Sequence, residues 1–206
     1  MGQLRQIQKA LDIHPYRTIE PGERTHAAVA LVLEETAKGL NLLLIERATN
    51  ENDYWSGQIA FPGGRRETVD DCPQQTARRE TREETGLDLG AASYLGRLSD
   101  FAPAGMKIVV SGFVYAIGHR SELTPDPEEI ADAFWFPIDE IRNPARLTEV
   151  RCVFRERLRT FPAVDVGKRQ PLWGISYHLL RSLEKRVTRN SNQRVSLTVP
   201  SSGQLA

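Results

Sequence analysis

The sequence predicts an α/β (α+β) fold in which one mixed β-sheet is flanked by helices. Hydrophobic runs typical of buried strands are interleaved with two main helical patterns, which favours a sheet with helices on its faces. With 206 residues, of which 40% are hydrophobic, the chain is long enough for one domain with a substantial core. It contains no Walker loop and no dinucleotide-binding glycine fingerprint, and its connections are too irregular for a doubly wound domain.

The first third of the chain predicts a helix followed by a β-hairpin. Leu4, Ile7 and Leu11 recur at helical spacing, so residues 3–12 are expected to form an amphipathic helix. The expected elements that follow are strands over 26–33 and 41–47 joined by a turn at Lys38-Gly39, a polar loop over 49–54, and a short strand over 58–61 that ends at Pro62-Gly63-Gly64.

A second helix is expected from about residue 73 to Thr85. Pro73 is favoured in a first helical turn, and Asp71 or Cys72 can act as the N-cap. Gly86 can adopt the left-handed conformation that commonly ends a helix. The preceding loop, over residues 65–70, has no hydrophobic periodicity.

The second half of the chain predicts further strands and a long helix. Strands are expected over 93–101, 107–117, 130–136, 150–154 and 161–166, with a short helix opened by Pro137. Gly112, inside one of these strands, indicates a bulge or a close approach of another segment. Residues 172–187 predict a helix whose core-facing stripe contains Leu172, Ile175, Leu179, Leu183 and Val187.

The expected domain organisation has three parts. A helix and lead-in over residues 1–20 precede one domain over 21–187, and residues 188–206 are expected to form a disordered tail. The tail is rich in serine, asparagine and glutamine and has no acidic residue, a composition that buries little hydrophobic surface.

Charge and cysteine content restrict the class of partner. The chain has 27 Lys plus Arg and 27 Asp plus Glu, so no net charge attracts it to nucleic acid or to an anionic membrane. Its two cysteines lie far apart, which excludes a disulfide framework, and no hydrophobic run is long enough to cross a membrane. We therefore expect a soluble, cytoplasmic protein.

The most informative stretch is residues 61–87, FPGGRRETVDDCPQQTARRETREETGL. In the expected helix, Glu80, Glu83 and Glu84 lie three or four positions apart and Arg79 lies one turn before Glu83. Two carboxylates about 4 Å apart repel by roughly 4 kcal/mol at an effective dielectric of about 20, and a divalent cation would turn this repulsion into attraction. A solvated helix face is the alternative explanation, since glutamate is a strong helix former.

This stretch resembles the signature of the Nudix hydrolases, G-x5-E-x7-R-E-U-x-E-E-x-G-U, in which U is a hydrophobic residue. Arg79-Glu80, Glu83-Glu84, Gly86 and Leu87 match it at the right spacings. Asp71 stands where the family has glutamate, but six residues rather than five separate it from Gly64. Thr81 occupies the first U position. The resemblance, which extends over roughly residues 25–187, implies a Nudix-type α/β/α sandwich.

Other segments look like the coenzyme A pyrophosphatase branch of this family. They are residues 43–47, the Gly57-Gln58-Ile59-Ala60 sequence before FPGG, AFWFP over 133–137, and LWGISYHLL over 172–180. The branch signature has a threonine where Ile45 stands and an arginine near Asn52, and its loop is one residue shorter.

The resemblance implies hydrolysis of a phosphoanhydride bond in a nucleoside diphosphate derivative, with Mg²⁺ or Mn²⁺ as the cofactor. The implied metal ligands are Glu80, Glu83, Glu84 and the carbonyl of Gly64, and Arg79 would orient a glutamate. Either Glu83 or Glu84 can instead be the general base.

Candidates outside the signature also have plain structural explanations. Glu128 and Glu129 lie where a base can be placed in this family, or on a solvated turn. Arg47 is a candidate phosphate ligand, or a surface ion pair. Trp55, Phe61 and Phe101 can stack on a nucleobase or pack in the core. Cys72 has no neighbouring histidine in sequence and is a poor candidate for a nucleophile.

Two other functions can be built on the same fold. A non-catalytic nucleotide sensor often lacks signature glutamates, all of which this chain keeps, and an isomerase needs an additional acid or cysteine at its centre. The choice among coenzyme A, nucleotide sugars, dinucleoside polyphosphates and oxidised triphosphates stays open. The resemblance allows a homodimer, since many relatives are dimers, but it leaves the oligomeric state open.

Overall fold

A mixed β-sheet forms the centre of the molecule in the computed structural model, which describes residues 2–49, 55–118 and 122–196. The strand order is β5-β6-β1-β2-β3-β10-β9-β8, with β4 paired to β1 and β7 paired to β2. Two pairs, β1–β6 and β3–β10, are parallel and the others are antiparallel. The strands are β1 Thr25–Thr36, β2 Gly39–Arg47, β3 Ile59–Ala60, β4 Gly63–Arg65, β5 Ser93–Arg97, β6 Ile108–Ile117, β7 Ile130–Pro137, β8 Leu147–Phe154, β9 Arg157–Val164 and β10 Leu172–Trp173.

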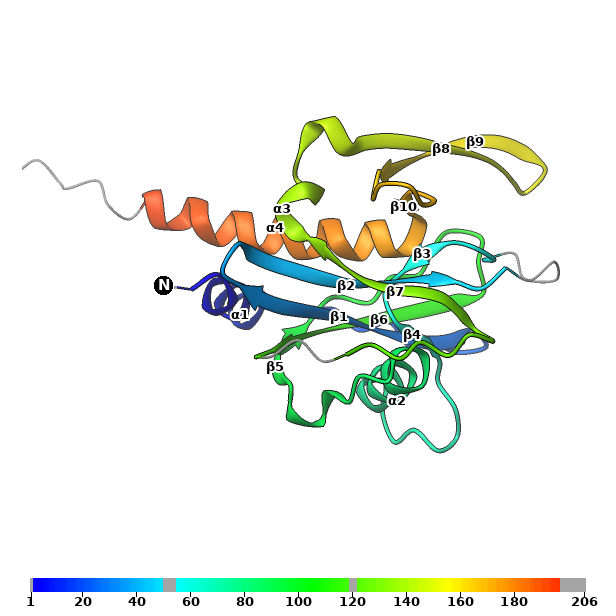
Figure 1. Cartoon of the computed structure of the whole chain (residues 1–206), viewed down its shortest axis with the longest axis horizontal. Helices are drawn as coiled ribbons and strands as arrows, with labels where there is room; N and C mark the ends of the chain where they lie inside the picture. Colours follow the sequence, from blue (N-terminus) through cyan, green and yellow to red (C-terminus); the bar gives the residue numbers. More distant parts are fainter. Residues whose placement is uncertain (1, 50–54, 119–121, 197–206) are drawn as a thin grey trace, which may run out of the picture.

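Helices cover both faces of this sheet (Figure 1). They are α1 Gln3–Ile13, α2 Pro73–Thr85, the short α3 Ile138–Ile141 and α4 Gly174–Ser196, with 3₁₀ turns at η1 Leu89–Ala91 and η2 Pro144–Arg146. One buried cluster joins α1 and α4 to the sheet, and a second cluster joins α2 to the opposite face. The expected mixed sheet flanked by helices is therefore confirmed.

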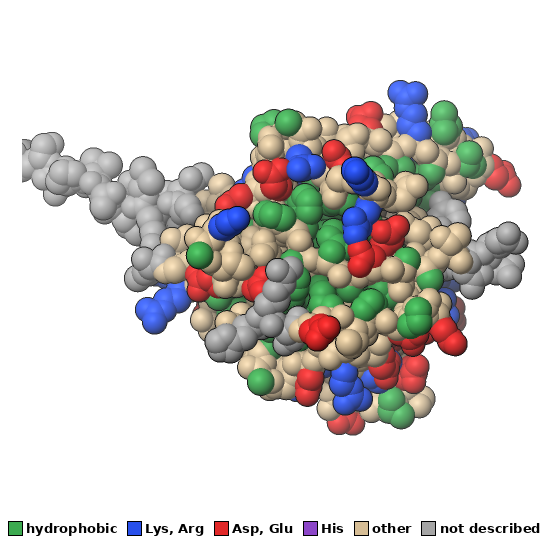
Figure 2. Space-filling view, viewed as in Figure 1, with side chains coloured by type: hydrophobic (Ala, Val, Ile, Leu, Met, Phe, Trp, Pro, Cys, Tyr) green, Lys and Arg blue, Asp and Glu red, His purple; other side chains and the backbone are tan. Residues whose placement is uncertain are grey.

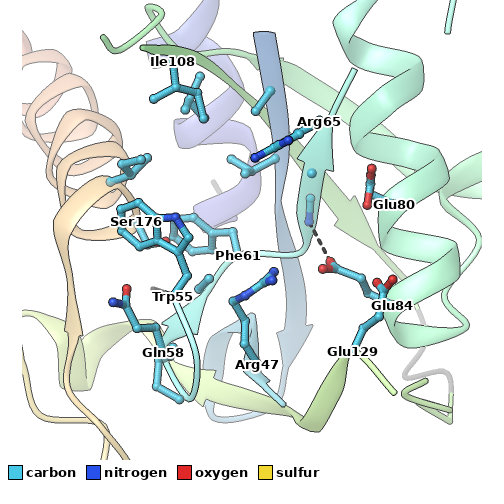
Figure 3. A pocket seen from close by; sticks show the side chains of 18 of the residues that line it. Arg47, Trp55, Gln58, Phe61, Arg65, Glu80, Glu84, Ile108, Glu129 and Ser176 are labelled. Carbon is cyan, nitrogen blue, oxygen red and sulfur yellow. Dashed lines mark hydrogen bonds between the residues drawn. The ribbon is translucent and has the colours of Figure 1, made fainter. Parts of the chain in front are cut away.

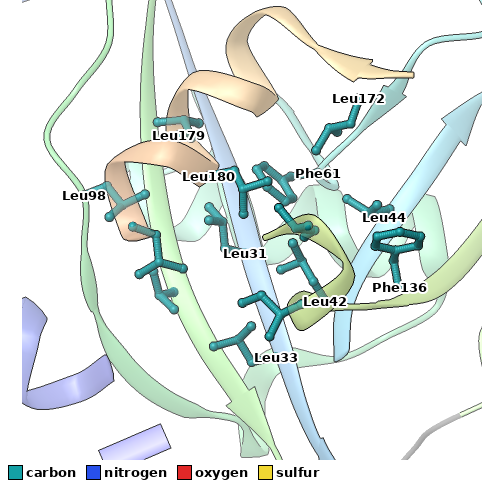
Figure 4. Close-up of a cluster of buried hydrophobic side chains, with 14 of the residues drawn as sticks. Leu31, Leu33, Leu42, Leu44, Phe61, Leu98, Phe136, Leu172, Leu179 and Leu180 are labelled. Atoms are coloured by element: carbon teal, nitrogen blue, oxygen red, sulfur yellow. The ribbon is translucent and has the colours of Figure 1, made fainter. Parts of the chain in front are cut away.

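The larger cluster is built from leucine side chains of α4 and of the central strands (Figure 4). Leu179 and Leu180 of α4 are fully buried against Leu31, Leu33 and other residues of the sheet. Full burial of each such side chain contributes about 2 kcal/mol. This packing fixes the first half of α4 on the sheet, so that the segment before it, β10, borders the cavity described below.

The smaller cluster holds α2 against the sheet through small and hydroxyl-bearing side chains. Ala77 is fully buried, and so are Thr81 and Thr85. The two threonine hydroxyls donate hydrogen bonds to carbonyls one turn back in α2, at 2.6 Å each. A threonine at the first hydrophobic position of the signature is thus accommodated, because its polar atom is satisfied within its own helix.

Strands β1 and β2 separate as they leave their hairpin turn, and this separation opens the centre of the sheet. They pair directly only between residues 33–36 and 39–42. Farther along, β4 pairs with residues 27–29 of β1, whereas β3 pairs with Ile45 and Glu46 of β2. Pro62 connects these two short strands, so residues 59–65 line a hollow between β1 and β2.

Three expectations are corrected here. Gly63-Gly64 does not end the strand region but forms β4, because these glycines fit against β1; a Cβ on Gly63 would lie 2.3 Å from the carbonyl oxygen of Ala28. Leu172 belongs to β10, and α4 begins two residues later at Gly174. Of the two alternatives expected at Gly112, the close approach is found, to Leu98, Leu179 and Leu31, whereas the bulge is wrong, since it lies between Tyr94 and Gly96 on β5.

The other element predictions match the structure within a few residues, including the hairpin β8–β9 and the left-handed Gly86 with φ of 73°. Helix α4 continues to Ser196, so the expected start of the tail at residue 188 falls inside this helix. Residues 50–54 of the expected loop and residues 197–206 of the expected tail lie outside the described part of the chain. No described helix is long and hydrophobic enough to cross a membrane. Positive and negative side chains are interspersed over the face in Figure 2.

Candidate functional site

A cavity of about 760 Å³ lies where β1 and β2 separate (Figure 3). Its walls come from β1, the segment 58–65, α2, and the start of α4. Acidic side chains line one side, and Arg47 and Arg65 also reach it. This combination of carboxylates and guanidinium groups around one cavity suits a polar, anionic ligand that is held together with a cation.

Glu84 is the most deeply buried carboxylate of the cavity. Its side chain comes from the last turn of α2, and the residue is 2% exposed. The backbone N–H of Gly63 donates a hydrogen bond of 2.8 Å to Glu84 Oε2. Burial raises the pKa of Glu84 to about 8; the Gly63 bond and the charge of Arg47 act against this rise, and the charges of Glu80 and Glu129 add to it. A bound cation would offset the penalty for ionising this group.

Glu80 lies one turn before Glu84 and faces the backbone of Gly64. A Cβ on Gly64 would lie 2.4 Å from the carboxylate carbon of Glu80, so only glycine leaves this space free. Burial also raises the pKa of Glu80, with further contributions from Glu83 and Glu129, although Arg79 counteracts them. The glycine of the signature therefore lets a backbone segment and a carboxylate approach each other closely.

Arg79 joins the acidic residues around α2 into one network. Its Nη1 lies 3.0 Å from Glu80 Oε1 and 2.8 Å from Glu83 Oε2. On its other side, Nε and Nη2 donate to the two oxygens of Asp70, at 3.0 and 2.9 Å. Arg79 is not one of the described residues that line the cavity. It therefore affects the cavity through its contact with Glu80.

The acidic residue that pairs with Arg79 is Asp70 and not Asp71, which corrects the sequence alignment. Asp70 is 4% exposed and also accepts hydrogen bonds from Thr76 and from the backbone N–H of Glu67. The hydrogen bonds from Arg79 lower the pKa of Asp70 to about 2, although burial opposes this. Asp71 is exposed and bonds to Gln75, and the helix N-cap is Cys72.

Glu83 diverges from Glu84, although it shares the Nη1 of Arg79 with Glu80. Its side chain is 50% exposed, bonds to Arg79, and lies outside the cavity lining. The reason is helical geometry, since adjacent residues of a helix are rotated by about 100°, and Glu83 and Glu84 therefore diverge. The structure thus brings Glu80 and Glu84 together and leaves Glu83 on the solvent side of Arg79.

Glu128 and Glu129 line the cavity from the segment before β7. The charge of Glu129 contributes to the raised pKa of both Glu80 and Glu84, which places it close to them. Sequence order separates these groups by more than forty residues, and β7 brings them together by pairing with β2. Figure 3 shows Glu80, Glu84 and Glu129 on the same side of the cavity.

The three aromatic candidates have different surroundings. Phe61 lines the cavity but is 1% exposed and belongs to the main core cluster. Trp55 lines the cavity and also a second one, described below. Phe101 lines only the second cavity, where its ring stacks on that of His178 at 3.6 Å. Of these residues, Trp55 is therefore the best placed to contact a ligand in the first cavity.

The arrangement of oxygen donors fits a magnesium ion that shares its ligands with a substrate. Among the described residues, no three side chains of His, Cys, Asp or Glu lie together as a complete metal site. Mg²⁺ commonly takes one or two carboxylates and completes its shell with waters and substrate phosphates. Glu80 and Glu84 provide two such carboxylates, the first partly buried and the second fully buried, and both line the cavity.

Sequence reasoning missed three functional candidates. Five residues separate Gly64 from Asp70, as in the signature, so the glycine spacing already identifies Asp70 once the extra residue is placed after the acid. Arg65 lines the cavity because β4 pairs with β1, a pairing that its surrounding glycines did not predict. Trp173, which lines both cavities, lies in the segment 172–180 that resembles the coenzyme A pyrophosphatase branch, but no sequence pattern marked it as a cavity residue.

The fold and this site define a class of protein, and sequence comparison gives the same result. Residues 24–157, more than half of the chain, match the model of the NUDIX domain. The chain therefore belongs to the Nudix family.

Relatives of known sequence agree with this assignment. An uncharacterized protein of Schizosaccharomyces pombe is 32% identical over 59% of this chain and 39% of its own length. A probable nudix hydrolase of the same yeast is 29% identical over 75% of this chain and 53% of its own length. The uncharacterized Nudix hydrolase NudL of Yersinia pestis is 28% identical, over 71% of this chain and 72% of its own. The chain thus spans about half or less of the two yeast proteins.

Solved structures share the fold at low sequence identity. A MutT/nudix family protein from Enterococcus faecalis aligns with a TM-score of 0.56 and 16% identity over 91% of this chain and 70% of its own. The Nudix hydrolase RenU from M. Smegmatis aligns with a TM-score of 0.51 and 18% identity over 88% of this chain and 91% of its own. These similarities establish the mixed sheet with flanking helices.

Proposed function

We propose that this chain hydrolyses a phosphoanhydride bond in a nucleoside diphosphate derivative, with Mg²⁺ or Mn²⁺ as the cofactor. The observation that carries the proposal is the pair of carboxylates of Glu84, which is buried, and Glu80, which is partly buried; both line one cavity beside the glycine segment of β4. Burying two acids side by side is unfavourable unless a cation neutralises them. Family membership supports the same reaction class.

Each residue has a proposed part in this reaction. Glu80, Glu84 and the carbonyl of Gly64 would hold the metal, which neutralises the diphosphate and polarises phosphorus when bound. Glu83 is a further ligand or base only if its side chain leaves Arg79. Arg79 positions Glu80 and is itself held by Asp70.

We assign the general base to one of the carboxylates that line the cavity. Glu129 lies near Glu80 and Glu84, and it is a candidate to accept the proton of the attacking water alongside Glu84 itself. Arg47 and Arg65 would contact the phosphates of the substrate, since both line the same cavity as the acids.

Within this class, coenzyme A is the proposed substrate. The support is the resemblance of residues 57–60, 133–137 and 172–180 to the coenzyme A pyrophosphatase branch. Two of these segments form β3 and β10, which pair with each other at Ile59 and Leu172 and border the cavity. Two of the three segments that resemble the branch thus contribute to the wall of this cavity.

The test is hydrolysis with and without Mg²⁺, followed by mass spectrometry of the products with coenzyme A and ADP-ribose side by side. We expect metal-dependent cleavage of coenzyme A that Glu84→Gln abolishes, while Glu23→Gln, at an exposed position, leaves it unchanged. Metal-dependent cleavage of ADP-ribose alone would keep the reaction class and overturn the substrate. Tight nucleotide binding without cleavage of any substrate would identify a sensor and overturn the proposal.

A further inference from the structure

A second cavity, of about 630 Å³, adjoins the first. It lies between the β8–β9 hairpin, the segment 101–106 and the first turns of α4. Trp55, Trp173 and Ile175 line both cavities, so the two share a wall. One elongated ligand can therefore occupy both, with its diphosphate in the first cavity and its distal part in the second.

The second cavity is lined by four cationic side chains and by no acidic one among the described residues. These are Arg155 and Arg159 of the hairpin and Arg181 and Lys185 of α4. Arg181 is neutralised by Glu184, at 2.5 Å. Within the described chain, Arg155, Arg159 and Lys185 form no ion pair with an acidic side chain. The protein as a whole has no net charge, so this local excess of positive charge favours the binding of an anion in the second cavity.

Aromatic side chains form the walls between these cations. Phe101 and His178 stack with an interplanar angle of 12°, and Phe161 lies 5.5 Å from the ring of Trp173. Phe154 meets Phe161 edge to face. Such surfaces favour a flat ring, because aromatic stacking on a base contributes about 1–3 kcal/mol.

The hairpin turn positions one of the cations over the cavity. Arg155 and Glu156 form a two-residue turn with φ of 52° and 61°, closed by the pair Phe154 and Arg157. Two non-glycine residues in the left-handed region are unfavourable. The guanidinium of Arg155 lies against Gly105, where a Cβ would be 2.2 Å from its central carbon. The turn therefore bends the hairpin tip toward segment 101–106, which completes the cavity rim.

We propose that the second cavity binds a nucleoside that carries a phosphate monoester, as the distal part of the substrate. The base would stack on the aromatic walls, and the monoester, which carries close to two negative charges, would lie between Arg155, Arg159 and Lys185. This assignment rests on the proposed function, since it places the diphosphate of the same molecule in the first cavity.

The test uses ligands that differ by this one phosphate. Binding of adenosine 3′,5′-bisphosphate and of adenosine 5′-phosphate to the metal-free protein is measured by calorimetry. We expect the bisphosphate to bind at least about tenfold more tightly, and Arg159→Gln and Lys185→Gln each to weaken it about three- to tenfold. The matched control is Arg151→Gln, an exposed arginine on the same hairpin that does not line the cavity.

Equal affinity for the two nucleotides, or an equal loss with Arg151→Gln, would overturn the proposal. Hydrolysis of coenzyme A and of its 3′-dephospho form then separates the two proposals. Selective bisphosphate binding without any hydrolysis would overturn the proposed function alone. Hydrolysis of both substrates with the same KM would overturn the second-cavity assignment alone.

Discussion

Arg79 and Asp70 form a nearly buried, two-pronged ion pair, with Nη2 of Arg79 lying 2.9 Å from Oδ2 of Asp70. Asp71, its neighbour in sequence, is exposed and takes no part in the pair. Because the same guanidinium also contacts Glu80, the position of a cavity carboxylate depends on a loop residue that does not line the cavity.

This pair predicts different effects of two neighbouring substitutions. Asp70→Asn should lower the free energy of unfolding at pH 7 by roughly 2 kcal/mol, whereas Asp71→Asn, the matched control, should change it little. The pKa of Asp70 is lowered in the folded state, so its stabilising effect is present above its ordinary pKa near 4 and is lost as pH falls toward 2. Urea unfolding between pH 2 and 7 measures this difference, and equal stability of the two variants would refute the assignment.

Glu84 predicts the opposite dependence on pH in the metal-free protein. The pKa of Glu84 is raised to about 8 in the folded state. Its contribution to the free energy of unfolding is therefore fully present below its ordinary pKa near 4.5 and is lost as pH rises through 8. In EDTA, the protein should lose on the order of 1–3 kcal/mol of stability between pH 5 and 9 because of this group. Glu84→Gln should flatten this part of the profile. A wild-type profile that is identical to that of the variant would contradict the prediction.

Gly64 predicts a loss of metal binding without loss of the fold. In Gly64→Ala, the new methyl group would displace the Glu80 carboxylate, whose atoms lie 2.4–2.5 Å from the Cβ position. We expect Mn²⁺ affinity to fall by roughly tenfold or more, with a small change in melting temperature. Calorimetric titration with Mn²⁺ measures it. Gly118→Ala, where the added carbon meets no atom within 4 Å, is the control and should bind Mn²⁺ as the wild type does.

The hairpin turn predicts a gain in stability from a double substitution. Replacing Arg155-Glu156 by Asn-Gly introduces residues that favour positive φ, and should stabilise the protein by about 1–2 kcal/mol. Thermal unfolding should show a rise in melting temperature of a few degrees. Glu156→Gly alone keeps Arg155, and should retain bisphosphate binding while giving part of the gain. A lower melting temperature in both variants would show that the turn is not strained.

Much of the fold was predictable because local sequence controls it. The periodicity of residues 3–12, the hydrophobic runs of β1, β2 and β6, and the glycine that ends α2 are all signals within one element. The elements that were missed, β4 and β10, are short and depend on a partner strand. In the sequence, Gly63 and Gly64 resemble a turn, and it is their pairing with β1 that makes them part of a strand.

The sequence by itself determined that three glutamates, an arginine and a glycine segment would occur at the spacing of a Nudix site. Only the tertiary structure decided that Glu80 and Glu84 share the cavity while Glu83 does not, since helix rotation and the contact with β4 select among them. It also decided that Asp70 holds Arg79, and that Glu129, Arg65 and Trp173 join the site. These residues meet because β1 and β2 separate and other strands fill the gap, an arrangement of long-range pairings that no local pattern specifies.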